Sequence, residues 1–132
     1  KSFTKAEIQE SLWDTTNVVY SVPCEDPLHQ YIGQTKRPLK IRVQEHERSC
    51  WGDLSNIVPD ENNDNGIPYH TATTGNGFDF DNTSILECEE SALRRRILEG
   101  IHIMQKSNTC VNLIAGQKVD GCWAPLIQGL KL

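Results

Sequence analysis

Short runs of β-branched and aromatic residues predict three strands along this chain. Residues 16–22 (TNVVYSV) have this composition, and residues 29–34 (HQYIGQ) follow after the turn-forming sequence Pro-Cys-Glu-Asp-Pro. Two such runs joined by a short turn indicate a hairpin. A third run, TSILECE at 83–89, predicts a further short strand.

Apolar residues at helical spacing predict two longer helices. Pro38 suits the first turn of a helix, where its missing N–H group costs nothing, and this helix is expected to run to about Trp51. Leu39, Val43 and Cys50 mark its buried side. The second helix covers roughly residues 90–106, and its inward side chains are expected to be Leu93, Ile97, Leu98, Ile101 and Met104.

The remaining segments are expected to contain little regular structure. Residues 1–14 are interpreted as a linker or a short helix, because Ile8 and Leu12 lie four positions apart. Residues 52–82 are predicted to form a loop, since they include the turn-rich sequence PDENNDNG. Glycine and proline recur in residues 116–132, which predicts an irregular tail. These boundaries leave residues 15–115 as the folded domain.

The size and composition are typical of one globular domain. With 132 residues, of which 37% are hydrophobic and 23% charged, the chain can bury a core without disulfide or metal support. No apolar run approaches the roughly 20 residues that span a bilayer, so no membrane association is expected. The five cysteines include no Cys-x-x-Cys pair, which favours free thiols in an intracellular compartment. Because the first residue is Lys and not Met, the chain is expected to belong to a longer polypeptide.

The net charge of −5 is unfavourable for binding nucleic acid, because lysine and arginine supply much of the affinity for phosphates. Basic residues are nevertheless concentrated in residues 36–48 and in the run 94–96, while the acidic residues lie mostly elsewhere. A basic face on an acidic body is therefore expected, with weak DNA binding by this domain alone. The candidate DNA-contacting residues are Lys36, Arg37, Lys40 and Arg48.

Six side chains form a set suited to phosphodiester hydrolysis. This reaction needs an activated water, stabilisation of charge on the phosphate, help for the leaving oxygen and accurate placement. A carboxylate could hold a divalent metal ion, and an arginine offers a planar fork of donors for phosphate oxygens. The arginine and the histidine lie four residues apart and so share one helix face. The set consists of Tyr20, Tyr31, Arg42, His46, Glu99 and Asn112.

Tyr20 is the candidate base or water-positioning group of this set. A tyrosine has an ordinary pKa of about 10, so Tyr20 needs a cation such as Arg42 or the metal ion to act as a base. His46 is expected to titrate near neutrality. Taken singly, each residue has a simpler interpretation: a tyrosine as a strand aromatic, Glu99 as a solvated helix residue and Asn112 as the cap of a turn.

The ordered set of motifs resembles the GIY-YIG nuclease domain over roughly residues 16–113. The matching residues are Val19-Tyr20, the run Tyr31-Ile32-Gly33-Gln34-Thr35, Arg42 with His46, Glu99 and Asn112, while Val18 stands where the family has glycine. Longer segments are most similar to the endonuclease domain of Penelope-like retroelements. These segments are YSVPC, QYIGQTKRPLKIRVQEH, HTATTGNGFDFDNTSIL and RRRILEGIHI.

The resemblance implies an α/β fold with a small three-stranded sheet, antiparallel or mixed, flanked by helices, in agreement with the elements predicted above. It implies that Tyr20 and Tyr31 line the site near the nucleophilic water, and that Arg42 and His46 contact the scissile phosphate or transfer protons. It further implies that Glu99 binds Mg²⁺ or Mn²⁺. Two other residues support the site, Gly33 by allowing close backbone approach and Asn112 by holding the geometry.

The resemblance also implies a function and its partners. The expected activity is that of a metal-dependent DNA endonuclease, which nicks target DNA in the nucleus as part of a polypeptide with a reverse transcriptase. A catalytically silent DNA-binding or interaction module with the same fold is the alternative, favoured by the acidic net charge and the altered first motif.

A zinc-stabilised structural domain is a third, weaker alternative. In Penelope-like elements two cysteines and two histidines are thought to bind zinc. Here Cys24 and His70 match that set, His29 lies near the position of the absent second cysteine, and Asn76 stands at that of the second histidine. A zinc site is therefore not expected.

Overall fold

The centre of the computed structural model is an antiparallel sheet of three strands, and the structure describes residues 2, 4–60 and 62–113. The central strand β1 (Val18–Pro23) lies between β2 (Gln30–Thr35) and β3 (Ser84–Cys88). β1 and β2 form the predicted hairpin, in which Tyr20 is paired with Gly33. The predicted α/β class, with a three-stranded sheet flanked by helices, is confirmed, and both strand pairs are antiparallel.

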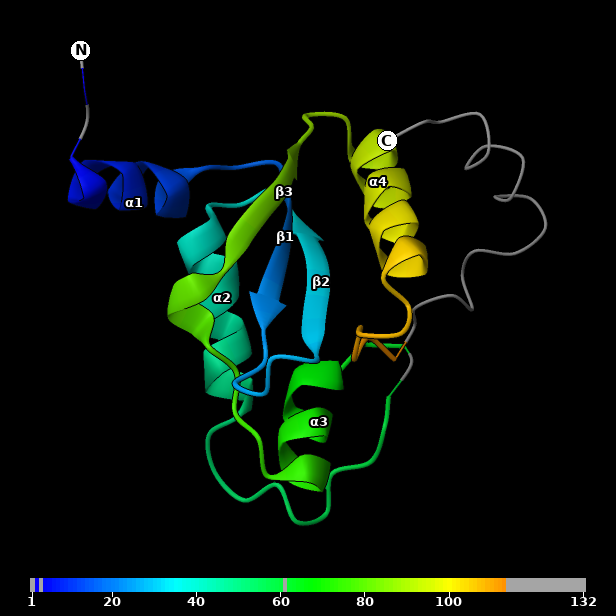
Figure 1. Cartoon of the computed structure of the whole chain (residues 1–132). Coiled ribbons are helices and arrows are strands. Elements are labelled where there is room, and N and C mark those ends of the chain that lie inside the picture. The colour runs from blue at the N-terminus through cyan, green and yellow to red at the C-terminus, as the bar shows by residue number, and fades with distance from the viewer. Residues whose placement is uncertain (1, 3, 61, 114–132) are drawn as a thin grey trace.

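Helices flank the sheet on opposite sides (Figure 1). α2 (Leu39–Ser49) and α3 (Gly66–Thr74) contact each other on one side, while α4 (Ala92–Gln105) packs against β2 and β1 on the other. α1 (Lys5–Asp14) projects from the body and contacts α2, and the short 3₁₀ helix η1 (Phe80–Asn82) precedes β3. No helix in the described part of the chain combines the length and apolar character that crossing a membrane requires.

The alternation of side chains along β1 produces two cores, one on each face of the sheet. Val18, Tyr20 and Val22 share one core with residues of α2 and α3. Val19 points to the opposite face, where it packs with Ile32 and with residues of α4. The buried partners on the first face are Leu39, Val43 and Ile67, and the partner on the second is Ile103.

The predicted loop at 52–82 is wrong in part, because it contains α3. The sequence GIPYHTATT has glycine, proline and four threonines or aromatics, which are poor helix formers. Tertiary packing stabilises this helix instead, because Ile67 is buried in the first core. Gly75 ends the helix in the left-handed conformation, with φ of 77°.

The boundaries of α1 and α2 lie close to the predicted ones. Residues 5–14 form a helix whose N-cap, Thr4, makes a capping box with Glu7. Pro38 is the N-cap of α2 and not its first helical residue, and that helix ends at Ser49. The predicted irregular tail at 116–132 lies outside the described residues.

The prediction for the inward face of α4 is correct at Ile101, which is buried, and at Leu98, which packs on the second core, but not at the two ends of the helix. Leu93 and Met104 are exposed, whereas Arg95 and Ile103 are buried. The Arg95 guanidinium is satisfied there, since it donates to the side chains of Gln34 and Asn17 and to two backbone carbonyls of residues 89 and 90. The run 94–96 is therefore not a continuous basic surface.

Candidate active site

The candidate site is built around Tyr20, whose ring lies over the edge strand β2. A Cβ atom at Gly33, the pairing partner of Tyr20, would come within 2.6 Å of Cζ of that ring. Any residue other than glycine would therefore displace the phenol. The Tyr20 hydroxyl makes a hydrogen bond of 2.7 Å with Nε2 of His46. β1 thus supplies the tyrosine hydroxyl, the glycine of β2 leaves room for the tyrosine ring, and α2 supplies the histidine that bonds to the hydroxyl.

α2 also brings an arginine and a histidine to the second tyrosine. The ring centroids of His46 and Tyr31 lie 4.9 Å apart in an edge-on arrangement. Nη1 of Arg42 donates to Glu45 at 3.0 Å, and Arg37 donates to both oxygens of the same carboxylate. A guanidinium has five N–H donors. Arg42 is partly exposed, so it has donors to offer a phosphate.

Asn112 ties the segment after α4 to β2, beside Tyr31. Its Oδ1 accepts the Ile32 N–H at 3.0 Å, and its Nδ2 donates to the Ile32 carbonyl at 2.6 Å. The same amide donates to Asp64 at 3.1 Å, and the Leu113 N–H donates to the other oxygen of that carboxylate at 2.9 Å. Asp64 is not among the site residues predicted from the sequence, because it lies in a predicted loop and at no fixed spacing from the motif residues.

Glu99 is an acidic group of α4 whose environment disfavours its ionisation. Burial raises the pKa of Glu99 from 4.5 to about 7, and the negative charge of Asp64 raises it too, while Arg42 and Arg96 lower it. The simpler interpretation of Glu99 as a solvated glutamate therefore does not hold. A buried carboxylate whose ionisation is opposed by a neighbouring negative charge fits a divalent cation such as Mg²⁺, which prefers oxygen ligands.

The tyrosines and the histidine of the site are neutral at physiological pH. Burial raises the pKa of both Tyr20 and Tyr31, and the opposing effect of Arg42 does not compensate. Burial, followed by the charge of Arg42, lowers the pKa of His46 to about 3. The expectation that His46 titrates near neutrality is therefore wrong. A neutral imidazole keeps one ring nitrogen as an acceptor, which suits the Tyr20 hydroxyl.

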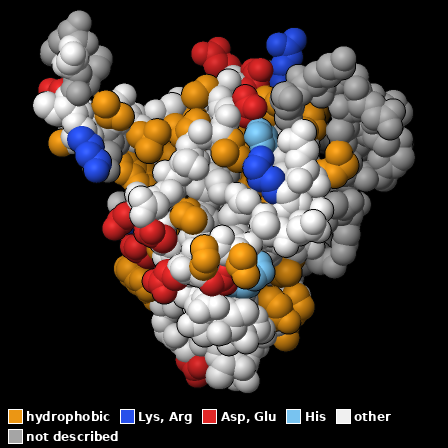
Figure 2. Space-filling model, in the orientation of Figure 1, with side chains coloured by type: hydrophobic (Ala, Val, Ile, Leu, Met, Phe, Trp, Pro, Cys, Tyr) orange, Lys and Arg blue, Asp and Glu red, His pale blue; other side chains and the backbone are white. Residues whose placement is uncertain are grey.

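The predicted DNA-contacting residues are all exposed, but two of them are paired. Arg37 binds Glu45 at 2.7 Å, and Lys40 binds Asp14 at 2.8 Å. Lys36 and Arg48 complete the set, and neither has an ion-pair partner among the side chains that the structure describes. Figure 2 shows Lys and Arg side chains at separate places on the face in view and not in one basic patch.

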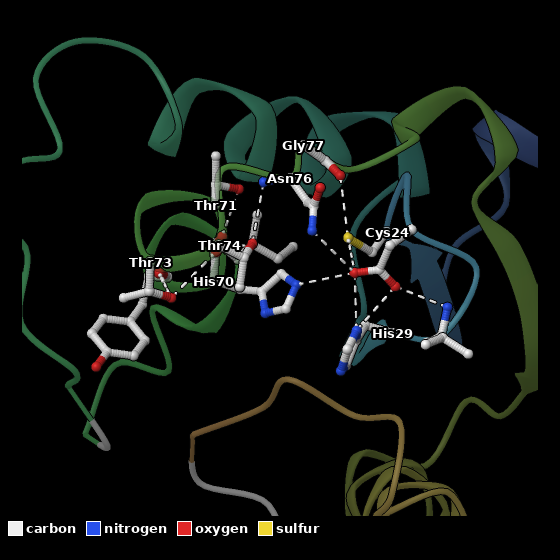
Figure 3. A network of polar contacts seen from close by, with 12 residues as sticks. Cys24, His29, His70, Thr71, Thr73, Thr74, Asn76 and Gly77 are labelled. Atoms are coloured by element: carbon white, nitrogen blue, oxygen red, sulfur yellow. Dashed lines mark hydrogen bonds and ion pairs between the residues drawn. The ribbon is translucent and has the colours of Figure 1, made fainter.

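A second polar cluster lies where the β1–β2 hairpin meets α3 (Figure 3). Sγ of Cys24, a carboxylate oxygen of Asp26 and a ring nitrogen of His70 all lie within 4.8 Å of one another. Nδ1 of His29 lies 3.0 Å from both carboxylate oxygens of Asp26, and Nδ2 of Asn76 donates to one of them at 3.4 Å. The structure thus brings together the four residues considered for zinc and adds Asp26.

The protonation states of Asp26 and His70 in this second cluster suit a metal ion. Nε2 of His70 is buried without a hydrogen-bond partner in the described structure, and burial lowers the pKa of this histidine. Burial opposes the ionisation of Asp26, but hydrogen bonds, above all from His29, lower its pKa to about 2. Burial raises the pKa of the Cys24 thiol, so a metal ion would have to displace its proton to bind the sulfur. One sulfur, one nitrogen and one oxygen are ligands that Zn²⁺ accepts in proteins.

Comparison with known proteins adds no relative to this picture. Neither the models of protein families, nor the curated proteins, nor the solved structures contain a match to this chain. The resemblance to GIY-YIG nucleases is therefore carried by the motif residues alone.

Proposed function

We propose that this chain is a metal-dependent DNA endonuclease domain of the GIY-YIG type. The observation that carries the proposal is that its reactive groups, predicted from separate segments, converge on the edge strand β2. Tyr20 comes from β1, Arg42 and His46 from α2, and Glu99 from α4, where the charges of Arg42 and Glu99 both act on Tyr20. These side chains gather around Gly33, whose lack of a Cβ atom is needed only because the Tyr20 ring lies over it. Such an arrangement favours a functional site over an ordinary protein surface.

Each residue has a role in the proposed hydrolysis. A divalent ion held by Glu99 would polarise the phosphate and stabilise the leaving oxygen. Arg42 binds the phosphate oxygens through its remaining donors. The oxygen of a water molecule attacks phosphorus, and the bond from phosphorus to the leaving oxygen breaks. The water passes its proton to Tyr20 as the phenol passes its own to Nε2 of His46.

The low pKa of His46 is compatible with this proton transfer. The value of about 3 results from burial and from the positive charge of Arg42. A bound phosphodiester is an anion, and it neutralises Arg42, so both effects favour the imidazolium. Asn112 keeps β2 in register with the segment after α4 through its two bonds to Ile32.

The motifs favour a role in a retroelement, where the domain would nick target DNA in the nucleus beside a reverse transcriptase. Lys36 and Arg48 supply contacts to the DNA backbone. The net charge of −5 makes such binding weak, and the remainder of a longer polypeptide would add affinity.

The proposal is tested by nicking of supercoiled plasmid with Mg²⁺ or Mn²⁺, with EDTA as control. The wild-type protein is compared with Glu99→Ala and with Glu90→Ala, in which an exposed carboxylate just before α4 is removed. Metal-dependent nicking lost only in Glu99→Ala is expected. A folded wild-type protein that binds DNA and leaves it intact would instead identify a catalytically silent binding module.

Nε2 of His70 favours a second function, the binding of a structural zinc ion, because it is buried without a hydrogen bond and lies 3.8 Å from an oxygen of Asp26. The ion would be held by Cys24, Asp26 and His70 and would fasten the hairpin to α3. Metal analysis of the purified protein should give one zinc per chain, absent in Cys24→Ser but retained when exposed Cys88 is changed to Ser. A wild-type protein without stoichiometric zinc would remove this second function.

A further inference from the structure

A pocket of about 350 Å³ lies between α1, α2 and η1, three elements that meet on one side of the sheet (Figure 1). None of the six residues assigned to the nuclease site lines it. Its volume is near the lower end of the range typical of ligand sites, which suits a single side chain of a partner. The lining residues are Trp13 of α1, Lys40, Val43, Gln44 and Glu47 of α2, and Phe80 and Asp81 of η1.

The floor of the pocket is apolar and largely aromatic. Val43 is buried in the first core, and Trp13 and Phe80 pack against that core while each stays partly exposed. The rings of Phe80 and Phe78 lie with their centroids 6.3 Å apart, which is within the range of an aromatic pair. Core packing thus fixes the aromatic residues at the pocket, and the faces of such rings attract cations.

The charged groups around the pocket leave a negative balance. Nζ of Lys40 lies 2.8 Å from a carboxylate oxygen of Asp14, so its positive charge is already paired. Glu47 and Asp81 are exposed, and neither carboxylate has an ion-pair partner among the side chains that the structure describes. An aromatic floor bordered by two unpaired carboxylates is complementary to a cation.

The pocket lies on a different side of α2 from the proposed nuclease residues. Its four lining residues within positions 40–47 are spaced three and four apart, so they share one helix face. Arg42 and His46 form another row, rotated from that face by about 130° at 3.6 residues per turn. The second row is the one that bonds to Tyr20. A partner in the pocket would therefore leave the nuclease residues free.

We propose that this pocket binds an arginine side chain from a basic peptide segment of a partner protein. The planar guanidinium stacks on aromatic rings, and its fork of donors binds carboxylates. Trp13 and Phe80 supply the aromatic surface. Glu47 and Asp81 accept from the guanidinium N–H groups. The net charge of −5 favours the approach of a basic partner.

The test follows the indole N–H signal of Trp13 in NMR spectra while the peptide acetyl-Gly-Gly-Arg-Gly-Gly-amide is added. Trp13→Phe identifies that signal. A dissociation constant of about 1 mM is expected, because the pocket takes one side chain of a flexible peptide. The control peptide carries citrulline in place of arginine, which keeps the shape of the side chain and removes its charge. It should bind about tenfold more weakly or less well still.

Two variants remove the proposed carboxylate partners. Glu47→Gln and Asp81→Asn should each weaken binding of the arginine peptide by about twofold to fivefold. Glu90→Gln is the matched control, because Glu90 is an exposed carboxylate just before α4 that does not line the pocket. It should leave the affinity unchanged. Denaturation curves for all variants ensure that folded proteins are compared.

Several outcomes would overturn the arginine site. These are equal binding of the citrulline peptide, the absence of any saturable shift in the Trp13 signal, and an equal loss of affinity in Glu90→Gln and Asp81→Asn. A Trp13 signal that shifts with protein concentration alone, together with slower diffusion, would also overturn it. That result would assign the pocket to a second copy of this chain.

Discussion

Replacement of Glu99 by Gln should stabilise the metal-free protein at pH 8 and leave its stability unchanged at pH 4. Burial, followed by the charge of Asp64, raises the pKa of Glu99 from 4.5 to about 7. At about 1.4 kcal/mol for each pH unit, this rise corresponds to at most about 3.5 kcal/mol. The Glu99 side chain keeps some contact with solvent, so the expected gain is about 2 kcal/mol.

The sign follows from which state holds the proton more tightly. Between about pH 4.5 and pH 7 the Glu99 carboxyl is ionised in the unfolded chain and protonated in the folded protein. Stability therefore falls as the pH rises through this window, and the full penalty is present above it. Glutamine has no titrating proton, so the variant lacks the penalty.

Urea denaturation in metal-free buffer at both pH values measures the effect. Glu90→Gln is the control, because its carboxylate is exposed, and it should differ from wild type by less than about 0.5 kcal/mol. Added Mn²⁺ should stabilise the wild-type protein and not Glu99→Gln. A Glu99→Gln variant that is no more stable than wild type at pH 8 would refute the buried, charge-opposed environment of this residue.

Three further predictions concern activity and DNA binding. Gly33→Ala should lower plasmid nicking by about tenfold or more and cost about 1–3 kcal/mol in denaturation, since the new methyl group displaces the phenol above it; wild-type nicking would contradict this. At low metal concentration, the nicking rate should rise with pH around 7, because Glu99 ionises there, and the pH profile should show no inflection near 6.5 from His46. A profile whose midpoint shifts when His46 is replaced would count against this assignment. Lys36→Ala should weaken DNA binding, measured by fluorescence anisotropy, more than Lys40→Ala, because Lys40 is already paired; the opposite order would contradict the assigned DNA contacts.

The sheet and the longer helices could be predicted because their signals are local. β1 and β2 have β-branched and aromatic runs around a turn, and α2 has apolar residues at helical spacing. α3 could not be predicted, since its residues have low helix propensity and Ile67 is fixed by the core it enters. The inward face of α4 was predicted only in part, because Arg95 is buried through hydrogen bonds to distant segments.

In the candidate site, too, the features with a local sequence signal could be predicted and those set by distant segments could not. Tyr20, Arg42 and His46 were identified from their order and spacing, and the structure brings them together. The environment of Glu99 depends on Asp64, which is 35 positions earlier in a loop, and no pattern in the sequence links the two. Protonation states were likewise out of reach, because the pKa of His46 depends on burial by elements far apart in the chain.

The most direct test of the central claim is plasmid nicking at pH 8 by the wild-type protein and Glu99→Gln, with Mg²⁺ or Mn²⁺ present. At this pH the variant is expected to be more stable than the metal-free wild type, so a loss of activity cannot be attributed to unfolding. The nuclease assignment predicts that the wild type nicks, that EDTA stops it and that the folded variant leaves the plasmid supercoiled. Nicking by Glu99→Gln at the wild-type rate, or none by the folded wild type, would contradict it.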